Sequence, residues 1–174
     1  NVLKGEGDNR IFIFFLDYSK AFDVTSREIL RTRLLECGIP VSTIELIEAI
    51  YRETKSRCRV GGSVSPYFMT YAGFAQGCNL SPCLFGIYID PLLRKIAGSI
   101  YVAELSILTK AIYAFADDFS CIAIGAKNIQ KCIQNCKEMS DTLEMQANVI
   151  KSAVMCLGHD KVEETFTWGE RVLP

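Results

Sequence analysis

Two adjacent carboxylates between two apolar runs constrain the fold of this chain most. Asp117 and Asp118 follow residues 111–116 and precede residues 119–124, and both runs are short and rich in Ile, Ala and aromatic side chains. Such runs are typical of buried strands, so we predict a hairpin with the acids at its turn. Aspartate suits a turn because its side chain can bond nearby backbone. Two like charges held together also favour a bound cation, and the pair alone does not separate the two explanations.

Length, composition and net charge limit the classes of protein to which the chain can belong. Its 174 residues suffice for one domain with a buried core, and 49% hydrophobic and 22% charged residues are usual for a globular protein. No apolar run reaches the roughly 18 residues of a membrane span, so we expect no membrane partner. The net charge of −1 is not the basic footprint typical of nucleic-acid binding. Basic residues are concentrated between residues 27 and 59, which could provide a local surface for nucleic acid. A solvated helix face explains these residues equally well.

The cysteines do not indicate a metal centre. There are 8 of them without a Cys-x-x-Cys pair, and the chain has 1 histidine, His159. A zinc site is therefore not expected. We predict that all the cysteines are reduced packing residues of an intracellular protein, with the choice between nucleus and cytoplasm left open.

A second acid follows a second apolar run. Residues 10–16 form a run that begins at Arg10, is apolar from Ile11 to Leu16, and is followed by Asp17. Half-buried strands alternate in polarity, so this run predicts a central strand buried on both faces. Asp17 would then lie at the carboxyl end of that strand, a favoured place for ligand chemistry.

The remaining periodicity predicts an α+β fold. We expect helices over residues 27–37, 42–54, 83–97 and 127–145, a hairpin over 56–71 that turns at Gly61-Gly62, and a last strand over 152–157. Thr25 or Ser26 can cap the first helix, and residues 42–45 have the spacing of a capping box. The order predicts an antiparallel sheet with helices on one face, in a ferredoxin-like β–α–ββ–α–β layout.

This layout can gather three acids at one point. If the strand that ends at Asp17 lies beside the hairpin, its carboxylate meets those of Asp117 and Asp118. Such a cluster can hold two divalent metals roughly 3.5–4 Å apart for a phosphoryl displacement. The chain offers no convincing Ser-His-Asp or Cys-His alternative.

Four segments resemble, in order, the palm motifs of reverse transcriptases of the non-LTR, LINE-type retrotransposons. They are residues 15–23, 73–85, 115–118 and 148–152. The resemblance implies a ferredoxin-like polymerase palm with part of the fingers, inserted over about residues 38–80 of a single domain. It also implies a fragment of a larger polyprotein, with fingertips upstream, a thumb downstream and further flanking domains.

The resemblance implies roles for individual residues. Asp17, Asp117 and Asp118 match the metal-binding acids, and Lys151 matches a lysine near the triphosphate that can donate a proton to pyrophosphate. Phe22 matches the bulky gate that presses on a ribose 2′-OH. The other residues implied to bind the nucleotide are Tyr18, Ser19, Lys20, Ala21, Gln76 and Gly77.

The implied activity is RNA-directed DNA polymerisation during retrotransposition. The implied cofactor is Mg²⁺, with Mn²⁺ as an alternative, and the implied partners are an RNA template, a DNA primer and dNTPs. Three positions depart from the family pattern: Ala75 replaces Arg, Asn79 replaces Pro and Phe115 replaces Tyr. None is an acid of the site, but they leave open an alternative, a catalytically inactive palm that binds RNA or protein as a scaffold.

Overall fold

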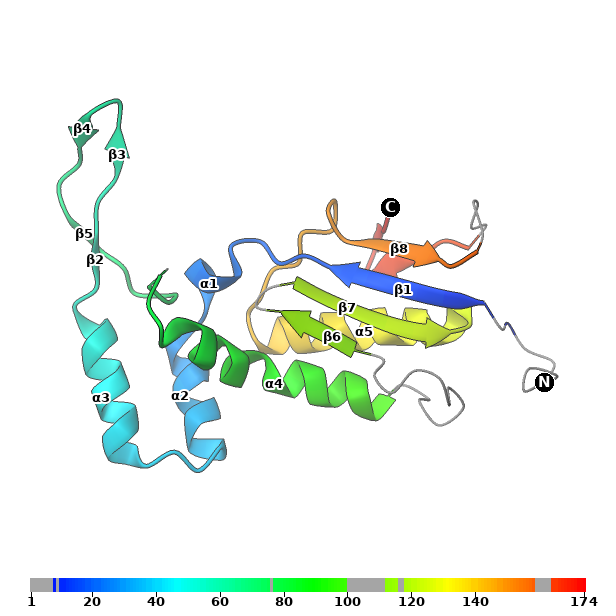
Figure 1. Cartoon of the computed structure of the whole chain (residues 1–174), viewed down its shortest axis with the longest axis horizontal. Helices are drawn as coiled ribbons and strands as arrows, with labels where there is room; N and C mark the ends of the chain where they lie inside the picture. Colours follow the sequence, from blue (N-terminus) through cyan, green and yellow to red (C-terminus); the bar gives the residue numbers. More distant parts are fainter. Residues whose placement is uncertain (1–7, 9, 76, 100–111, 116–117, 159–163) are drawn as a thin grey trace. The chain divides into compact units, whose positions relative to one another are not determined.

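The computed structural model describes residues 8, 10–75, 77–99, 112–115, 118–158 and 164–174 (Figure 1). The chain forms two compact units. The sheet unit contains Asn1–Ser19 and Ile89–Pro174, and the helix–hairpin unit contains Lys20–Tyr88. One long helix, α4 (Ser81–Ser99), begins in the second unit and ends in the first. Within the described residues, no helix combines the length and apolarity needed to cross a membrane.

A four-stranded antiparallel sheet forms the centre of the sheet unit (Figure 1). Its strands are β1 (Ile11–Leu16), β6 (Ile112–Phe115), β7 (Asp118–Ile124) and β8 (Ala153–Cys156). Their order is β6-β7-β1-β8, so β1 is central, as predicted. Helix α4 precedes β6 in the chain and α5 (Ala126–Thr142) precedes β8, which confirms the ferredoxin-like layout.

Helices cover one face of this sheet. Phe12, Phe14 and Leu16 are buried, whereas Phe15 between them is 42% exposed. The prediction that β1 is buried on both faces is therefore wrong. An antiparallel sheet needs only one covered face, and here α5 lies along that face (Figure 1). A salt bridge of 2.7 Å between Lys95 on α4 and Glu138 on α5 links the two helices.

Helix α5 is amphipathic, as its sequence predicts. Its buried residues are Ile129, Cys132, Ile133, Cys136 and Ser140. A disulfide joins Cys132 to Cys121 on β7, so the prediction that all cysteines are reduced is wrong for this pair. Both side chains are buried at the contact between helix and sheet, where spacing along the chain cannot reveal the pairing.

The helix–hairpin unit begins with three helices. They are α1 (Ala21–Val24), α2 (Arg27–Glu36) and α3 (Val41–Arg52). Ser26 caps α2, because its hydroxyl accepts a hydrogen bond from the backbone N–H of Ile29 at 3.5 Å. Helix α3 instead begins directly after Pro40, so Ser42 lies inside the helix and the predicted capping box is wrong.

An exposed hairpin follows α3 (Figure 1). Its short strands are β2 (Lys55–Ser56), β3 (Arg59–Val60), β4 (Ser63–Val64) and β5 (Phe68–Met69). β2 pairs with β5 and β3 pairs with β4, and the chain turns at Gly61 and Gly62, whose φ angles are 53° and 87°. Glycine adopts such positive angles without steric cost, so the predicted turn is confirmed.

A second small hairpin closes the sheet unit, and the sequence did not reveal it. It consists of β9 (Thr167–Trp168) and β10 (Arg171–Val172). The side-chain amide of Gln130 on α5 bonds both the N–H and the C=O of Thr167, each at 3.0 Å. Trp168 also packs near Phe14, with ring centroids 6.3 Å apart. Tertiary contacts therefore hold this hairpin in place.

Candidate active site

Strands β1 and β7 bring Asp17 and Asp118 to one place. The last pair of their antiparallel ladder is Leu16 with Phe119, and the two acids are the next residues along each strand. Leu16 and Phe119 are buried. Side chains alternate along a strand, so the acids point to the opposite, uncovered face. Both line one cleft of about 530 Å³.

This cleft also contains the predicted cationic residue. Lys151, in the turn before β8, lines it together with both acids. Asp118 and Lys151 are exposed, and Asp17 is half-buried. The remaining lining residues are Phe15, Leu16, Tyr113, Ala114, Phe119 and Ser120. Two carboxylates and one ammonium group thus face solvent at the edge of a rigid sheet.

The backbone of Asp17 is fixed on both sides. Its N–H donates to the hydroxyl of Ser152 at 3.1 Å, and its carbonyl accepts from the N–H of Asn148 at 2.8 Å. The Ser152 hydroxyl in turn donates to the carbonyl of Asn148 at 3.0 Å. Ser152 is fully buried. In this segment the sequence predicted a role only for Lys151. The signal that could have revealed the anchor of Asp17 was the pair of polar residues Asn148 and Ser152.

The chemistry of the two acids fits a divalent cation. Within the part of the chain that the structure describes, neither carboxylate accepts a hydrogen bond or forms a salt bridge. Carboxylate oxygens are the ligands that Mg²⁺ and Ca²⁺ prefer, and two of them with substrate phosphates suffice for Mg²⁺. The described residues contain no cluster of three or more metal-binding side chains, and Asp117, the predicted third acid, lies outside them.

Tyr18 points into the core and not into the cleft. It is 4% exposed, and its phenol lies 2.7 Å from the hydroxyl of Ser140 on α5. That hydroxyl donates to the carbonyl of Cys136, so Tyr18 is the donor to Ser140. Burial raises the pKa of the Tyr18 phenol. The N–H of Ser19, the next residue, donates to the carbonyl of Gln146 at 2.8 Å.

The other predicted nucleotide-binding residues belong to the helix–hairpin unit. Lys20 adopts a left-handed conformation, with φ of 53°, and Ala21 is buried. Phe22 stacks on Phe85, with ring centroids 4.6 Å apart and an interplanar angle of 23°. Phe22 and Gly77 line the same cleft of about 440 Å³. Gln76 lies outside the described residues.

The walls of this second cleft are partly polar. Besides Phe22 and Gly77, they comprise Cys78, Asn79, Ser81 and Pro82. A hydrogen bond from the backbone N–H of Leu80 lowers the pKa of the Cys78 thiol. The hydroxyl of Ser81 donates to the carbonyl of Ala75 at 2.7 Å, which fixes the loop before α4.

Two backbone hydrogen bonds tie the Phe22 segment to a glycine loop. The N–H of Phe74 donates to the carbonyl of Phe22, and the N–H of Gly73 to that of Thr25, both at 2.8 Å. Gly73 has φ of 77°, and a Cβ there would lie 2.5 Å from the carbonyl oxygen of Asp23. Only glycine permits this close approach.

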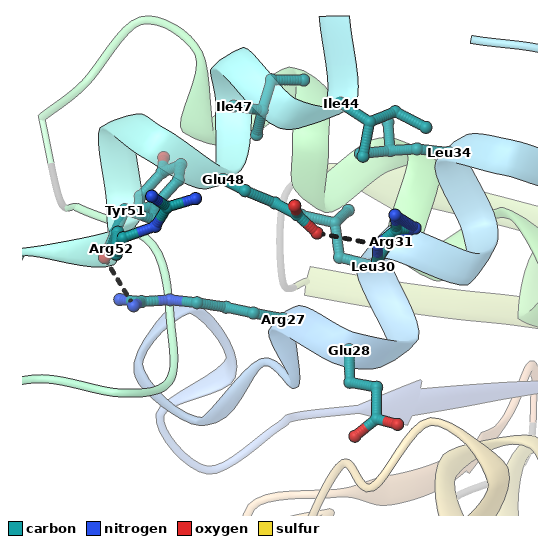
Figure 2. A pocket seen from close by; sticks show the side chains of 10 residues that line it. All are labelled: Arg27, Glu28, Leu30, Arg31, Leu34, Ile44, Ile47, Glu48, Tyr51 and Arg52. Atoms are coloured by element: carbon teal, nitrogen blue, oxygen red, sulfur yellow. Dashed lines mark hydrogen bonds and ion pairs between the residues drawn. The ribbon is translucent and has the colours of Figure 1, made fainter. Parts of the chain in front are cut away.

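A further pocket, of about 370 Å³, lies between α2 and α3 (Figure 2). Its walls are mainly apolar, with Leu30, Leu34 and Ile44 among them. Its polar groups join the two helices: Arg27 donates to the carbonyl of Tyr51 at 2.8 Å, and Arg31 pairs with Glu48 at 3.0 Å. This pocket is therefore a packing feature of the helix pair. Its described residues do not include a group of unpaired acids beside a lysine like that of the Asp17 cleft.

Comparison with known families gives a match over nearly the whole chain. The model of the family described as "Reverse transcriptase (RNA-dependent DNA polymerase)" matches residues 3–168. A Pol polyprotein of the type-2 retrotransposable element R2DM of Drosophila melanogaster is 29% identical over 140 residues. That alignment covers 80% of the chain and 13% of the polyprotein. A Pol polyprotein of an R2 element of Popillia japonica is 31% identical over 117 residues, 67% of the chain and 19% of that protein.

Solved structures support the fold. A telomerase from Candida tropicalis, in complex with a fragment of telomeric RNA, aligns with a TM-score of 0.61 at 14% identity. The alignment covers 95% of the chain and 29% of the telomerase. At this identity the similarity shows the fold alone, an α+β polymerase fold. The chain spans only a small part of each of these proteins.

Proposed function

The chain belongs to the reverse transcriptase family, and we propose that it forms the palm and part of the fingers of an RNA-directed DNA polymerase. Such a nucleotidyltransferase adds dNTPs to the 3′-OH of a primer. The observation that carries the proposal is the shared cleft of Asp17 and Asp118 at adjacent strand ends. In this proposal the fingers insertion covers about residues 38–80 of a single domain.

Asp17 and Asp118 would hold a divalent metal, together with Asp117. Reverse transcriptases use divalent ions, and the oxygen ligands of this site favour Mg²⁺, with Mn²⁺ as the alternative. Metal ions at such a site lower the pKa of the attacking hydroxyl and neutralise charge on the phosphates. The hydrogen bonds from Ser152 and Asn148 hold the Asp17 backbone still, so its carboxylate is oriented before the substrate arrives.

Lys151 would act on the triphosphate. Its ammonium group lies at the cleft that contains both acids, where it can attract the phosphates of a dNTP. It can also donate a proton to the leaving pyrophosphate.

Recognition of the sugar falls to Phe22 in this proposal. Its ring is held by the stack on Phe85 and lines a cleft with Gly77. A fixed aromatic ring excludes a 2′-OH by bulk alone, which selects dNTPs. The other residues proposed to contact the nucleotide through backbone or side chain are Tyr18, Ser19, Lys20, Ala21 and Gln76. For Tyr18 the contact would be through the backbone, since its side chain is buried.

The proposed partners are an RNA template, a DNA primer and the other domains of a Pol polyprotein, inside the cell. They follow from the relatives, which are Pol polyproteins of R2 retrotransposable elements. These Pol proteins are several times longer than this chain, which covers 13% and 19% of the two relatives.

Primer extension on an RNA template, in the complete protein that carries this chain, tests the function. We expect Mg²⁺-dependent extension by the wild type and background extension by Asp118→Asn. Asp141→Asn removes an exposed acid on α5 and should extend primers like the wild type. Full extension by Asp118→Asn would contradict the proposal. Absence of extension by the wild type would favour the inactive scaffold.

A further inference from the structure

Tyr18 and Ser140 form a buried contact on the face of the sheet opposite to the Asp17 cleft. Tyr18 directly follows Asp17, and its phenol donates to the hydroxyl of Ser140 on α5 at 2.7 Å. That hydroxyl donates in turn to the carbonyl of Cys136 at 2.6 Å. Tyr18 and Ser140 are 4% and 1% exposed, so water cannot take the place of a lost partner. The residue next to an acid of the cleft is thus held by α5.

The backbone around Asp17 is held by the segment that follows α5. The N–H of Asn148 donates to the carbonyl of Asp17, and the N–H of Ser19 donates to that of Gln146, both at 2.8 Å. These bonds join the end of β1 to a loop, whereas the phenol of Tyr18 reaches the helix itself. The Tyr18 side chain therefore adds a support of a different kind.

The same helix is fixed to the strand that carries Asp118. A disulfide joins Cys132 on α5 to Cys121 on β7, three residues after Asp118. Helix α5 also packs against β7 (Figure 1). The covalent bond prevents the helix from sliding along the strand, so Ser140, near the end of α5, has a fixed place relative to Asp118.

The two acids lie just beyond the paired part of β1 and β7. The last pair of this ladder is Leu16 with Phe119, and the backbone of Asp17 bonds Ser152 and Asn148 instead of β7. The separation of the two carboxylates therefore depends on the supports of the strand ends. Mg²⁺ is sensitive to that separation, because it requires near-ideal octahedral ligands, whereas Ca²⁺ accepts longer and more flexible coordination.

From this arrangement we propose that Tyr18 and Ser140 are positioning residues that set the separation of the Asp17 and Asp118 carboxylates. Asp118 belongs to a strand that is bound to α5, and Asp17 precedes a side chain that is bound to the same helix. Helix α5 thus holds both acids in one frame from the covered face of the sheet. The inference rests on the cation site of the proposed function and names what tunes that site to a small divalent ion.

Competition between cations on the 174-residue chain tests this proposal. Mn²⁺ binding is first measured for each variant by the electron paramagnetic resonance signal of the free ion, and Mg²⁺ or Ca²⁺ then displaces it. Tyr18→Phe removes the hydroxyl and keeps the ring. It should weaken Mg²⁺ binding about tenfold, as loss of a group that supports a metal ligand does. Ca²⁺ binding should fall less than about threefold.

Two further variants test whether the bond itself matters. Ser140→Ala should act like Tyr18→Phe, and Tyr18→Phe/Ser140→Ala should lose little more Mg²⁺ affinity than either, because all three break the same bond. Thr142→Ala is the matched control. It removes an exposed hydroxyl that donates to the carbonyl of Glu138, four residues earlier on the same helix, at 2.9 Å. This control should bind Mg²⁺ and Ca²⁺ like the wild type.

A merely structural role for Tyr18 predicts a different pattern. Equal weakening of Mg²⁺ and Ca²⁺ by Tyr18→Phe would overturn the proposal, as would wild-type affinities in that variant or additive losses in the double variant. Circular dichroism at the temperature of the titration verifies that each variant is folded. The measurement contains no primer or dNTP. A chain that shows the expected cation pattern but extends no primer would therefore contradict the polymerase function and support the positioning role.

Discussion

The hydroxyl of Ser152 accepts a hydrogen bond from the backbone N–H of Asp17, across 135 positions of sequence. This bond joins the end of the central strand to the segment that carries Lys151. It makes Ser152 a positioning residue for the cleft, although its own side chain is fully buried.

Replacing this hydroxyl should reduce both stability and activity. Ser152→Ala leaves the Asp17 N–H without its partner, which costs about 1–3 kcal/mol of unfolding free energy. Because the carboxylate of Asp17 is then less well oriented, we expect primer extension to fall about tenfold. Thr32→Ala removes a hydroxyl that donates to the carbonyl of Glu28 within α2, and it should leave primer extension unchanged. Equal activity in the two variants, measured at a temperature where both are folded, would contradict the role of Ser152.

Tyr18 should make the sheet unit sensitive to alkali. Burial raises the pKa of its phenol above the usual value of 10.0. Above pH 10.0 the unfolded chain loses the Tyr18 proton while the folded chain keeps it, so the free energy of unfolding falls as pH rises. Below pH 10.0 both states are protonated, and the contribution of Tyr18 to stability is fully present. Urea unfolding between about pH 9 and pH 11 should show a shallower decline for Tyr18→Phe. An unchanged decline would show that Tyr18 ionises in the folded protein.

Gly73 and Gly38 provide a matched test of the glycine loop. Their φ angles are 77° and 74°, but a Cβ meets backbone only at Gly73. We expect Gly38→Ala to cost about 1 kcal/mol from the backbone conformation alone. Gly73→Ala adds a clash with the carbonyl of Asp23 and should cost more than about 3 kcal/mol. Equal melting temperatures for the two variants would show that the loop approaches α1 less closely than described.

Phe22 should control the choice between dNTPs and rNTPs. Phe22→Ala removes the ring stacked on Phe85 and opens space for a 2′-OH. The preference for dNTPs in primer extension should then fall about tenfold or more, whereas Phe22→Tyr, which keeps the bulk, should retain it. If Phe22→Ala discriminates like the wild type, Phe22 is a packing residue only.

The sequence predicted the strands and helices that position Asp17 and Asp118, because the strands are clear apolar runs and the helices have a clear apolar period. The run before Asp17 and the runs around Asp117-Asp118 became β1, β6 and β7, and the period of α5 gave its buried face. The resemblance to reverse transcriptases was confirmed by the family match.

Features that depend on distant partners could not be predicted in this way. Tyr18 lies within a predicted nucleotide-binding segment, but its side chain is captured by Ser140, 122 positions away. The disulfide between Cys121 and Cys132 and the hairpin of β9 and β10 likewise depend on tertiary packing. The exposure of Phe15 reflects which face of the sheet the helices cover, which a continuous apolar run does not encode.

Direct measurement of metal binding tests the central claim, that Asp17 and Asp118 form one cation site. Mn²⁺ binding to the 174-residue chain can be followed by the electron paramagnetic resonance signal of the free ion. We expect Asp17→Asn and Asp118→Asn each to weaken Mn²⁺ binding, the double variant to lose little more affinity than either single variant, and Asp141→Asn to bind like the wild type. Binding of Mn²⁺ by the double variant with wild-type affinity would contradict this claim.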